Sequence, residues 1–204
     1  VEALEASLRD DHAEPRGLLR ITAPPGLAER QLMPLSADFI KRHPKVKLEL
    51  ELTHRMVDLV EEGYDLAIRA TRPRDSSLVV RRLAPAPVIA VAAPSYLERA
   101  GTPSHPRELS QHACLVDSNF RDGKRWRFEV DGEEASVTVA GPVKVNSPTA
   151  IRDLAVAGLG VALSPDFVVE RELAAGTLVE ILPGTVALGW SIVALYPRRD
   201  LVPA

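Results

Sequence analysis

The stretch VKLELEL, at residues 46–52, alternates apolar and charged side chains without a break. Period two is the repeat of a β-strand, so Val46, Leu48, Leu50 and Leu52 share one face and the charged residues share the other. One face of this strand is therefore predicted to be buried and the other to face water.

The elements on either side of this strand predict an alternating α/β order. LLRITA at 18–23 is a short apolar strand, and the apolar positions 28, 32, 35 and 39 then recur at helical steps of four, three and four. A short helix over 56–62, closed by Gly63, and the strand YDLAIRA at 64–70 are predicted next. Strands that alternate with helices through short connections indicate a mainly parallel sheet covered by helices.

The second half of the chain repeats this character. Two strands, LVVRRLA and PVIAVAA, lead to a helix at SYLERAG, and further strands are predicted at ACLVD, WRFEV and ASVTVA. Ser147 followed by Pro148, and Ser164 followed by Pro165, are each predicted to cap and open a helix. LGWSIVALYP, at 188–197, is the last predicted strand.

Composition bounds the class of protein. The chain has 204 residues, of which 46% are hydrophobic, and 25 basic against 28 acidic residues give a net charge of −3. A domain that holds nucleic acid by itself is usually basic, so this chain is not expected to bind DNA unaided. A single cysteine excludes an internal disulfide and a multi-thiolate metal site, and no apolar run is long enough to span a bilayer.

Motifs for catalysis are weak. The Gly158 to Gly160 pair lacks the third glycine of a dinucleotide fingerprint and follows a helix rather than a strand. His112 lies two residues before Cys114, but a small buried hydrophobe is the favoured interpretation of this cysteine. The five histidines lack the spacing of metal ligands. The adjacent glutamates at 61–62 and 133–134 are expected to point to different faces, which argues against paired acid–base catalysis. Trp126 and Trp190 are expected in the core. Neither a metal nor a cofactor is predicted.

Two positions suit ligand binding instead. In open α/β sheets, ligands bind outside the carboxyl ends of the strands, where helix N-termini present unpaired N–H groups. The first position is the turn at 23–26, after the first strand. The second is Asn146-Ser147-Pro148-Thr149, at the start of a helix.

Longer motifs resemble one known family. They are GLLRITAPPGLAERQLMPLSADFIKRHPKVKLELEL, MVDLVEEGYDLAIRA followed by SSLVVRRLAP, PSYLERAGTPSHPRELSQHACL and NSPTAIRDLAVAGLGVALSPDF. Together they resemble the effector-binding domain of LysR-type transcriptional regulators, and the resemblance runs from Gly17 to Pro197.

The resemblance implies an α/β fold like that of type 2 periplasmic binding proteins, with two lobes, two crossover strands and a small-molecule cleft between the lobes. Residues 1–17 then form the end of a linker helix and the linker that follows it, residues 18–92 and 188–204 form lobe I, and residues 93–187 form lobe II. The crossovers are expected near 90–94 and 186–191. The winged helix-turn-helix of the family, through which DNA would be bound, is absent from the sequence.

The resemblance also implies which residues contact the effector, and the two positions chosen on chemical grounds are among them. The implied contacts are Ala23, Pro24, Pro25, Gly26, Arg69, Ala70, Thr71, Val116, Ser118, Asn146, Ser147 and Thr149. Many relatives have a hydroxyl in the first turn, where Pro24 and Pro25 supply neither an N–H nor a side-chain donor. Capping of its own helix and ligand contact both remain open for Ser147, and a salt bridge to Asp75 is the alternative role for Arg69.

The sequence thus predicts a domain, not an enzyme, that senses a small molecule such as a carboxylate or an aromatic compound and forms homodimers or tetramers. It is expected in the cytoplasm, as part of a regulator that binds DNA and has no membrane partner. The helix at 27–42 and the strand at 46–52 are expected to form the dimer flank. A solute-binding protein of a transport system is the alternative function.

Overall fold

The computed structural model describes residues 14–71 and 78–198, which divide into two compact units. Unit 1 contains residues 14–68, 78–80 and 194–198, and unit 2 contains residues 69–71 and 81–193. The chain changes from one unit to the other within three strands, β3 (Leu66–Thr71), β4 (Val79–Ala92) and β11 (Gly189–Tyr196). This division differs from the predicted lobe boundary after residue 92, because residues 88–92 of β4 pair with strands of unit 2. The predicted lobe limits stay predictions.

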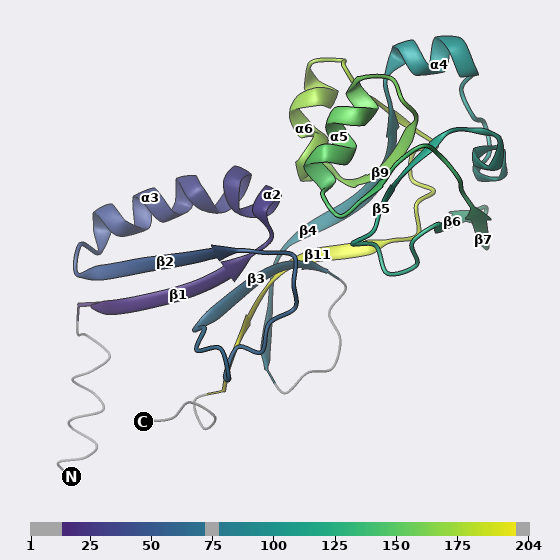
Figure 1. Cartoon of the computed structure of the whole chain (residues 1–204). Helices are drawn as coiled ribbons and strands as arrows, with labels where there is room; N and C mark the ends of the chain where they lie inside the picture. The colour runs from purple at the N-terminus through teal and green to yellow at the C-terminus, as the bar shows by residue number, and fades with distance from the viewer. Residues whose placement is uncertain (1–13, 72–77, 199–204) are drawn as a thin grey trace. The chain divides into compact units, whose positions relative to one another are not determined.

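Unit 1 is built on three parallel strands. β1 (Gly17–Ala23) lies between β2 (Val46–Leu52) and β3 (Leu66–Thr71), and the order β2-β1-β3 makes β2 an edge strand. The helical segment between β1 and β2 consists of α2 (Pro25–Leu27), a π-helical turn at Ala28–Leu32 and α3 (Met33–Arg42), and it runs alongside β1 and β2 (Figure 1). The strands at 18–23 and 46–52 and the helix between them are therefore confirmed.

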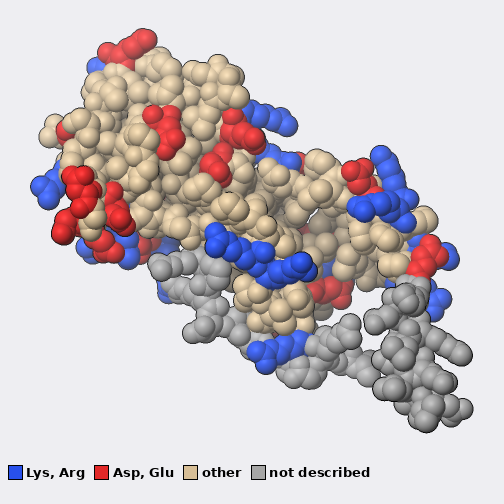
Figure 2. Space-filling model, turned by 180° about the vertical axis from the view of Figure 1, so that it is seen from behind, with Lys and Arg blue, Asp and Glu red and all other residues tan. Residues whose placement is uncertain are grey.

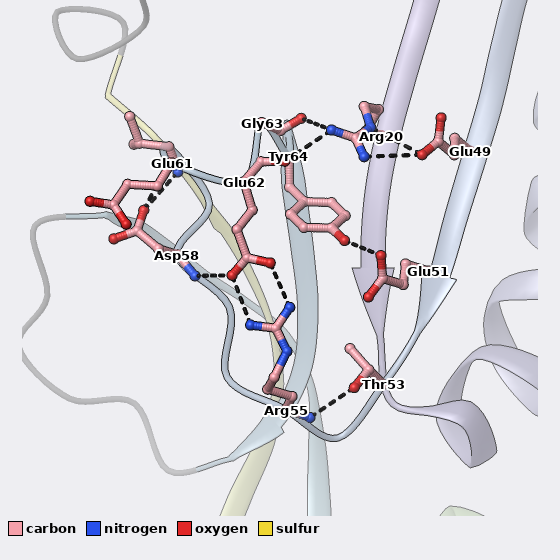
Figure 3. Close-up of polar contacts among 11 residues, drawn as sticks. Arg20, Glu49, Glu51, Thr53, Arg55, Asp58, Glu61, Glu62, Gly63 and Tyr64 are labelled. Atoms are coloured by element: carbon pink, nitrogen blue, oxygen red, sulfur yellow. Dashed lines mark hydrogen bonds and ion pairs between the residues drawn. The ribbon is translucent and has the colours of Figure 1, made fainter.

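The helix predicted over 56–62 is wrong, because this segment forms turns. Side chains hold its backbone instead: Oδ1 of Asp58 accepts hydrogen bonds from the N–H groups of residues 60 and 61, each at 3.0 Å. The Glu62 carboxylate accepts from the Asp58 N–H at 3.1 Å and from the Arg55 guanidinium at 2.8 and 2.5 Å (Figure 3). Gly63, predicted to close the segment, does so with φ +68, a left-handed conformation that glycine adopts readily.

Arg20 fastens this loop to the sheet. Its guanidinium donates to the carbonyl oxygens of Glu62 and Gly63, at 2.9 and 3.0 Å, and pairs with Glu49 on β2 at 3.1 Å (Figure 3). The same guanidinium lies over the ring of Tyr64, 5.0 Å from its centroid. The charged face of VKLELEL is thus used to hold a neighbouring loop as well as to face water.

Unit 2 has a mixed sheet in the order β10-β4-β9-β5-β8. β9 (Val161–Pro165) and β10 (Val179–Ile181) are antiparallel to β4, whereas β5 (Cys114–Asp117) is parallel to both β9 and β8 (Lys144–Val145). The two strands predicted at 78–84 and 87–93 are one, because Pro85 and Pro87 both precede the part of β4 that pairs with β9 and β10.

Helices cover the two faces of this sheet. α5 (Pro148–Val156) and α6 (Asp166–Ala174) pack on one face, where Leu115 and Ala162 contact Ile151 and Val168. The other face packs against α4 (Pro94–Ala100), the 3-10 helix at Pro106–Gln111 and the hairpin of β6 (Arg125–Val130) and β7 (Glu133–Thr138). The α/β class that the sequence predicted is confirmed.

One predicted helix cap is wrong. Ser164 lies within β9 rather than at the start of α6, and its hydroxyl donates to the carbonyl oxygen of Pro165 at 3.1 Å. Pro165 occupies the capping position of α6 without a side-chain cap, and Asp166 is the first helical residue.

Candidate functional site

The carboxyl ends of β5 and β8 lie side by side in unit 2. The parallel register pairs Val116 with Lys144 and Asp117 with Val145, and the Ser118 N–H continues the ladder by donating to the Val145 carbonyl at 2.9 Å. The sequence-predicted Ser118 and Asn146 therefore follow adjacent strands at the same sheet edge, and both are exposed. Val116 is 1% exposed and belongs to the core, so only its backbone lies at this edge.

α5 begins at this edge with a side-chain cap. The Ser147 hydroxyl accepts from the Ala150 N–H at 3.3 Å and lies 3.0 Å from the Thr149 hydroxyl. Capping, one of the two roles left open for Ser147, is thus confirmed, and its contact with a ligand stays a prediction. Pro148 occupies the first helical position and brings no N–H, which leaves the hydroxyl of the half-buried Thr149 as a polar group at this end of the helix.

The first turn of unit 1 offers few polar groups. Ala23 is fully buried at the end of β1, and its carbonyl oxygen accepts from the Thr53 N–H at 2.9 Å. The carbonyl oxygen of Pro24 accepts from the Ala28 N–H at 2.9 Å, and Pro25 opens the helix, followed by the buried Gly26. Since neither proline carries an N–H, this turn is suited to apolar contact rather than to anion binding.

β3 ends in the predicted residues Arg69, Ala70 and Thr71. Arg69 is only 5% exposed, whereas Ala70 and Thr71 are half-buried. A buried guanidinium requires partners, so Arg69 is a structural as well as a candidate binding residue. Its proposed salt-bridge partner, Asp75, lies outside the described residues.

Asp117 is not among the effector contacts predicted from the sequence, although it lies between two of them, Val116 and Ser118. It is 4% exposed at the last position of β5, and Oδ1 accepts from the Asn119 N–H at 2.9 Å. Burial raises the pKa of the Asp117 carboxyl to about 6, and the Asn119 hydrogen bond offsets part of this effect. The order Asp-Ser-Asn after an apolar strand is typical of a turn in which the Asp side chain accepts a hydrogen bond from the backbone two residues later. The sequence could therefore have predicted this turn.

The residues weighed for catalysis have structural partners. Cys114 is fully buried, its thiol contacts the Leu109 carbonyl at 3.6 Å, and burial raises its pKa to about 12. His112 instead pairs through Nδ1 with the Tyr96 hydroxyl at 3.1 Å, so the two residues form no nucleophile and base pair. Trp126 is core, as predicted, but Trp190 is half-buried and packs on a neighbouring ring.

Charge and metal chemistry add no second site. Acidic and basic side chains are interspersed with uncharged surface on the face drawn in Figure 2. Among residues 14–71 and 78–198, no three His, Cys, Asp or Glu side chains form a group that could hold a metal ion. No helix in these same ranges is both long enough and apolar enough to cross a membrane.

Comparisons with known proteins agree on one family. The model of the LysR substrate binding domain matches residues 12–204. The HTH-type transcriptional regulator PtxR of Pseudomonas aeruginosa is 37% identical over 200 residues, which is 97% of this chain and 64% of that protein. The uncharacterized HTH-type transcriptional regulator YhjC of Escherichia coli is 33% identical over 202 residues, 96% of this chain and 66% of that protein. The chain thus spans slightly less than two thirds of these relatives.

Solved structures support the same grouping. The full-length virulence activator AphB of Vibrio cholerae superposes with a TM-score of 0.81 at 28% identity, over 99% of this chain and 70% of that one. The regulatory domain of CrgA, a LysR-type transcriptional regulator from Neisseria meningitidis, gives a TM-score of 0.79 at 28% identity, with 92% and 91% covered. The fold implied by the sequence resemblance is therefore confirmed.

Proposed function

Because the chain belongs to the LysR substrate-binding domain family, we propose that it is the effector-sensing domain of a LysR-type transcriptional regulator. The observation that carries this proposal is the family match over residues 12–204, together with relatives that are transcriptional regulators. None of the relatives and structures reported above is a transport protein, which favours the regulator over the alternative of a solute-binding protein.

The intact regulator would bind DNA through a winged helix-turn-helix outside this sequence and would act in the cytoplasm, where its operator lies. The domain itself would bind a small molecule without transforming it. This view is supported by the burial of Cys114 and by the pairing of His112 with Tyr96, which leave these residues without catalytic geometry. We assign neither a cofactor nor a catalytic residue.

The proposed effector contacts in unit 2 are the exposed Ser118 and Asn146 and the hydroxyls of Ser147 and Thr149. Three observations support them: adjacent parallel strands end here, a helix begins here, and the four side chains lie at one edge of the unit. Predicted contacts elsewhere are the turn at 23–26 and the segment at 69–71. In the turn, Pro24 and Pro25 would make apolar contacts with the effector.

A thermal-shift screen of small carboxylates, amines and aromatic compounds tests this assignment. A molecule that binds only the folded state stabilises it by about 2.7 kcal/mol at 100 times its dissociation constant. Thr149→Leu, which puts a bulky apolar side chain at the start of α5, should abolish the stabilisation. Thr138→Leu, at an exposed position of β7, should retain it. If no compound stabilises the wild type, or if both variants respond alike, the assignment is wrong.

We also propose that the protein is a homodimer or tetramer that uses α3 and β2. Among the residues that the structure describes, α3 has no buried residue, its Leu35 is 64% exposed, and β2 is an edge strand, whose backbone needs cover. Leu35→Glu should therefore produce monomers in light scattering, whereas Leu83→Glu, at another exposed leucine, should not. A monomeric wild type would contradict this proposal.

A further inference from the structure

The Asp117 carboxyl is buried without a cationic partner. Its side chain is 4% exposed, and its Oδ1 accepts from the Asn119 N–H at 2.9 Å. In the part of the chain that the structure describes, no Lys, Arg or His forms an ion pair with it. Burying a carboxylate without a counter-charge costs folding free energy, so its presence in a folded domain requires a physical explanation.

The Asp117 side chain lies on the face of the sheet that α5 and α6 cover. Leu115, two residues earlier in β5, packs with Ile151 of α5 and Val168 of α6, and side chains two apart in a strand share a face. The register pairs Asp117 with Val145, directly before Asn146. The carboxyl is thus at the same sheet edge as the proposed effector contacts, on the side where α5 begins.

The start of α5 does not neutralise this carboxyl through its backbone donors. The Ala150 N–H donates to the Ser147 hydroxyl at 3.3 Å, and the Ile151 N–H donates to the Ser147 carbonyl at 3.0 Å. Pro148 contributes no N–H at all. Most donors of this first turn are therefore committed to the cap.

The charged side chains on the neighbouring elements do not neutralise it either. They are Lys144 on β8, Arg152 and Asp153 on α5, and Asp166, Glu170, Arg171 and Glu172 on α6, of which Glu170 and Arg171 are exposed. Lys144 is in register with Val116, so it lies on the opposite face from Val145 and Asp117. Arg152 pairs with Asp153 at 2.8 Å and with Glu172 at 3.4 Å, and burial raises the pKa of Asp166.

A second polar group lies beside the Asp117 carboxyl. Nδ2 of Asn119 is buried and makes no hydrogen bond of good geometry within the described ranges, although the Asn119 side chain lies close enough to the Asp117 carboxyl to lower its pKa. A buried donor without a partner costs free energy in the same way as a buried acceptor. Two neighbouring residues with incomplete polar contacts, next to exposed Ser118 and Asn146, are what a site for a polar ligand group requires.

We propose that Asp117 anchors a positively charged hydrogen-bond donor, a primary ammonium or guanidinium group, of the small molecule that this domain senses. The inference rests on the proposed function and adds the chemical class of the ligand. An ammonium group offers three donors and supplies the missing counter-charge, through charge-assisted hydrogen bonds. A carboxylate in the same place would instead be repelled by the ionised Asp117.

The test compares matched cations and anions as probes. n-Butylammonium is paired with butyrate, and 2-phenylethylammonium with 3-phenylpropionate, in thermal-shift titrations at pH 7.5 and at pH 5. The proteins are the wild type, Asp117→Asn and a control, Asp131→Asn, which removes the same charge at an exposed hairpin turn of the same unit. The cations should stabilise the wild type and the control at pH 7.5. Their binding to Asp117→Asn should be about tenfold weaker or more, because a buried charge pair is lost.

Lowering the pH provides an independent arm that does not depend on the folding of a variant. Protonation of Asp117 at pH 5 should weaken binding of the cations to the wild type and leave Asp117→Asn unchanged. If only carboxylates bind, and their binding is lost in Thr149→Leu but kept in Asp117→Asn, the ligand class is wrong while the proposed effector site stands. Cation binding that Asp117→Asn leaves intact, or four probes that all fail to bind, would also overturn the inference.

Discussion

A Cβ atom on Gly160 would lie 2.3 Å from the carbonyl oxygen of Ala113 and 2.9 Å from its carbonyl carbon. The two backbones approach so closely because β9 begins directly after Gly160, and the Val161 N–H donates to the same Ala113 oxygen at 2.8 Å. Gly158, with φ +73, ends α5 in the left-handed conformation. This glycine pair therefore joins a helix to a strand, and it has the wrong surroundings for a dinucleotide.

Gly160→Ala should destabilise the domain by about 2 to 4 kcal/mol, because the new methyl group meets backbone atoms that cannot rotate away. Gly189→Ala is the matched control, since no heavy atom lies within 4 Å of the added Cβ there. Its unfolding free energy should change by about 0.5 kcal/mol or less. Urea unfolding monitored by circular dichroism measures both, and equal stability of the two variants would contradict the close approach.

The Cys114 thiol should not react with a thiol reagent in the folded protein. It is fully buried, and burial raises its pKa to about 12, so almost none of it is the nucleophilic thiolate at neutral pH. Incubation with 5,5′-dithiobis(2-nitrobenzoic acid) should give no absorbance change until urea unfolds the chain. Rapid reaction of the native protein would show that this strand is accessible.

Ser147→Ala should lower the free energy of unfolding by about 0.5 to 2 kcal/mol, as expected for the loss of a helix cap. The Ser147 hydroxyl accepts from Ala150 at 3.3 Å, whereas Ser118, at the same sheet edge, is exposed and caps no helix. Ser118→Ala is therefore expected to leave stability unchanged. Thermal unfolding of both variants checks this, and an unchanged melting temperature for Ser147→Ala would mean that the hydroxyl is not the cap.

Asp117→Asn should stabilise the domain at neutral pH. Burial raises the folded-state pKa from the ordinary 3.8 to about 6, so the ionised carboxyl opposes folding above pH 6. A shift of about two units is worth about 3 kcal/mol at most. As the pH falls from 7 towards 4, Asp117 takes up a proton in the folded wild type before it does so in the unfolded chain. The difference in unfolding free energy between Asp117→Asn and the wild type should therefore disappear.

Urea unfolding of both proteins at pH 7.5, 6 and 4 measures that difference. A stability gap between Asp117→Asn and the wild type that is as large at pH 4 as at pH 7.5 would contradict a raised pKa. A variant that is less stable than the wild type at pH 7.5 would show that the Asp117 carboxylate has a stabilising partner.

Local patterns predicted the parts of the fold whose causes are local. VKLELEL forms β2 with the predicted limits, and Ser147 caps α5, because strand alternation and capping depend on residues within one element. The short strands β8 and β10 were not predicted, since two or three residues become a strand only through their neighbours in the sheet. The helix predicted at 56–62 is instead a set of turns, because the side-chain hydrogen bonds that hold it, such as those of Asp58 and Glu62, leave no recognisable pattern in the sequence.

The candidate site was predicted in part. The carboxyl ends of parallel strands and a capped helix start are visible in sequence, and the structure places Ser118 and Asn146 at one edge as those rules require. The burial of Asp117 could not be predicted, because it arises from α5 and α6, which follow much later in the chain. Sequence proximity likewise raised the possibility of a nucleophile and base pair of Cys114 and His112, whereas in the structure His112 forms a hydrogen bond with Tyr96.

The most direct test of the account is an amide correlation spectrum of the domain, titrated with a small molecule that the thermal-shift screen identifies. The largest chemical-shift changes are predicted at the amides of Ser118, Asn146, Ser147 and Thr149, and Thr149→Leu should suppress them. Changes confined to the β6–β7 hairpin or to α3, with none at these four amides, would contradict the claim that this edge of unit 2 senses the effector.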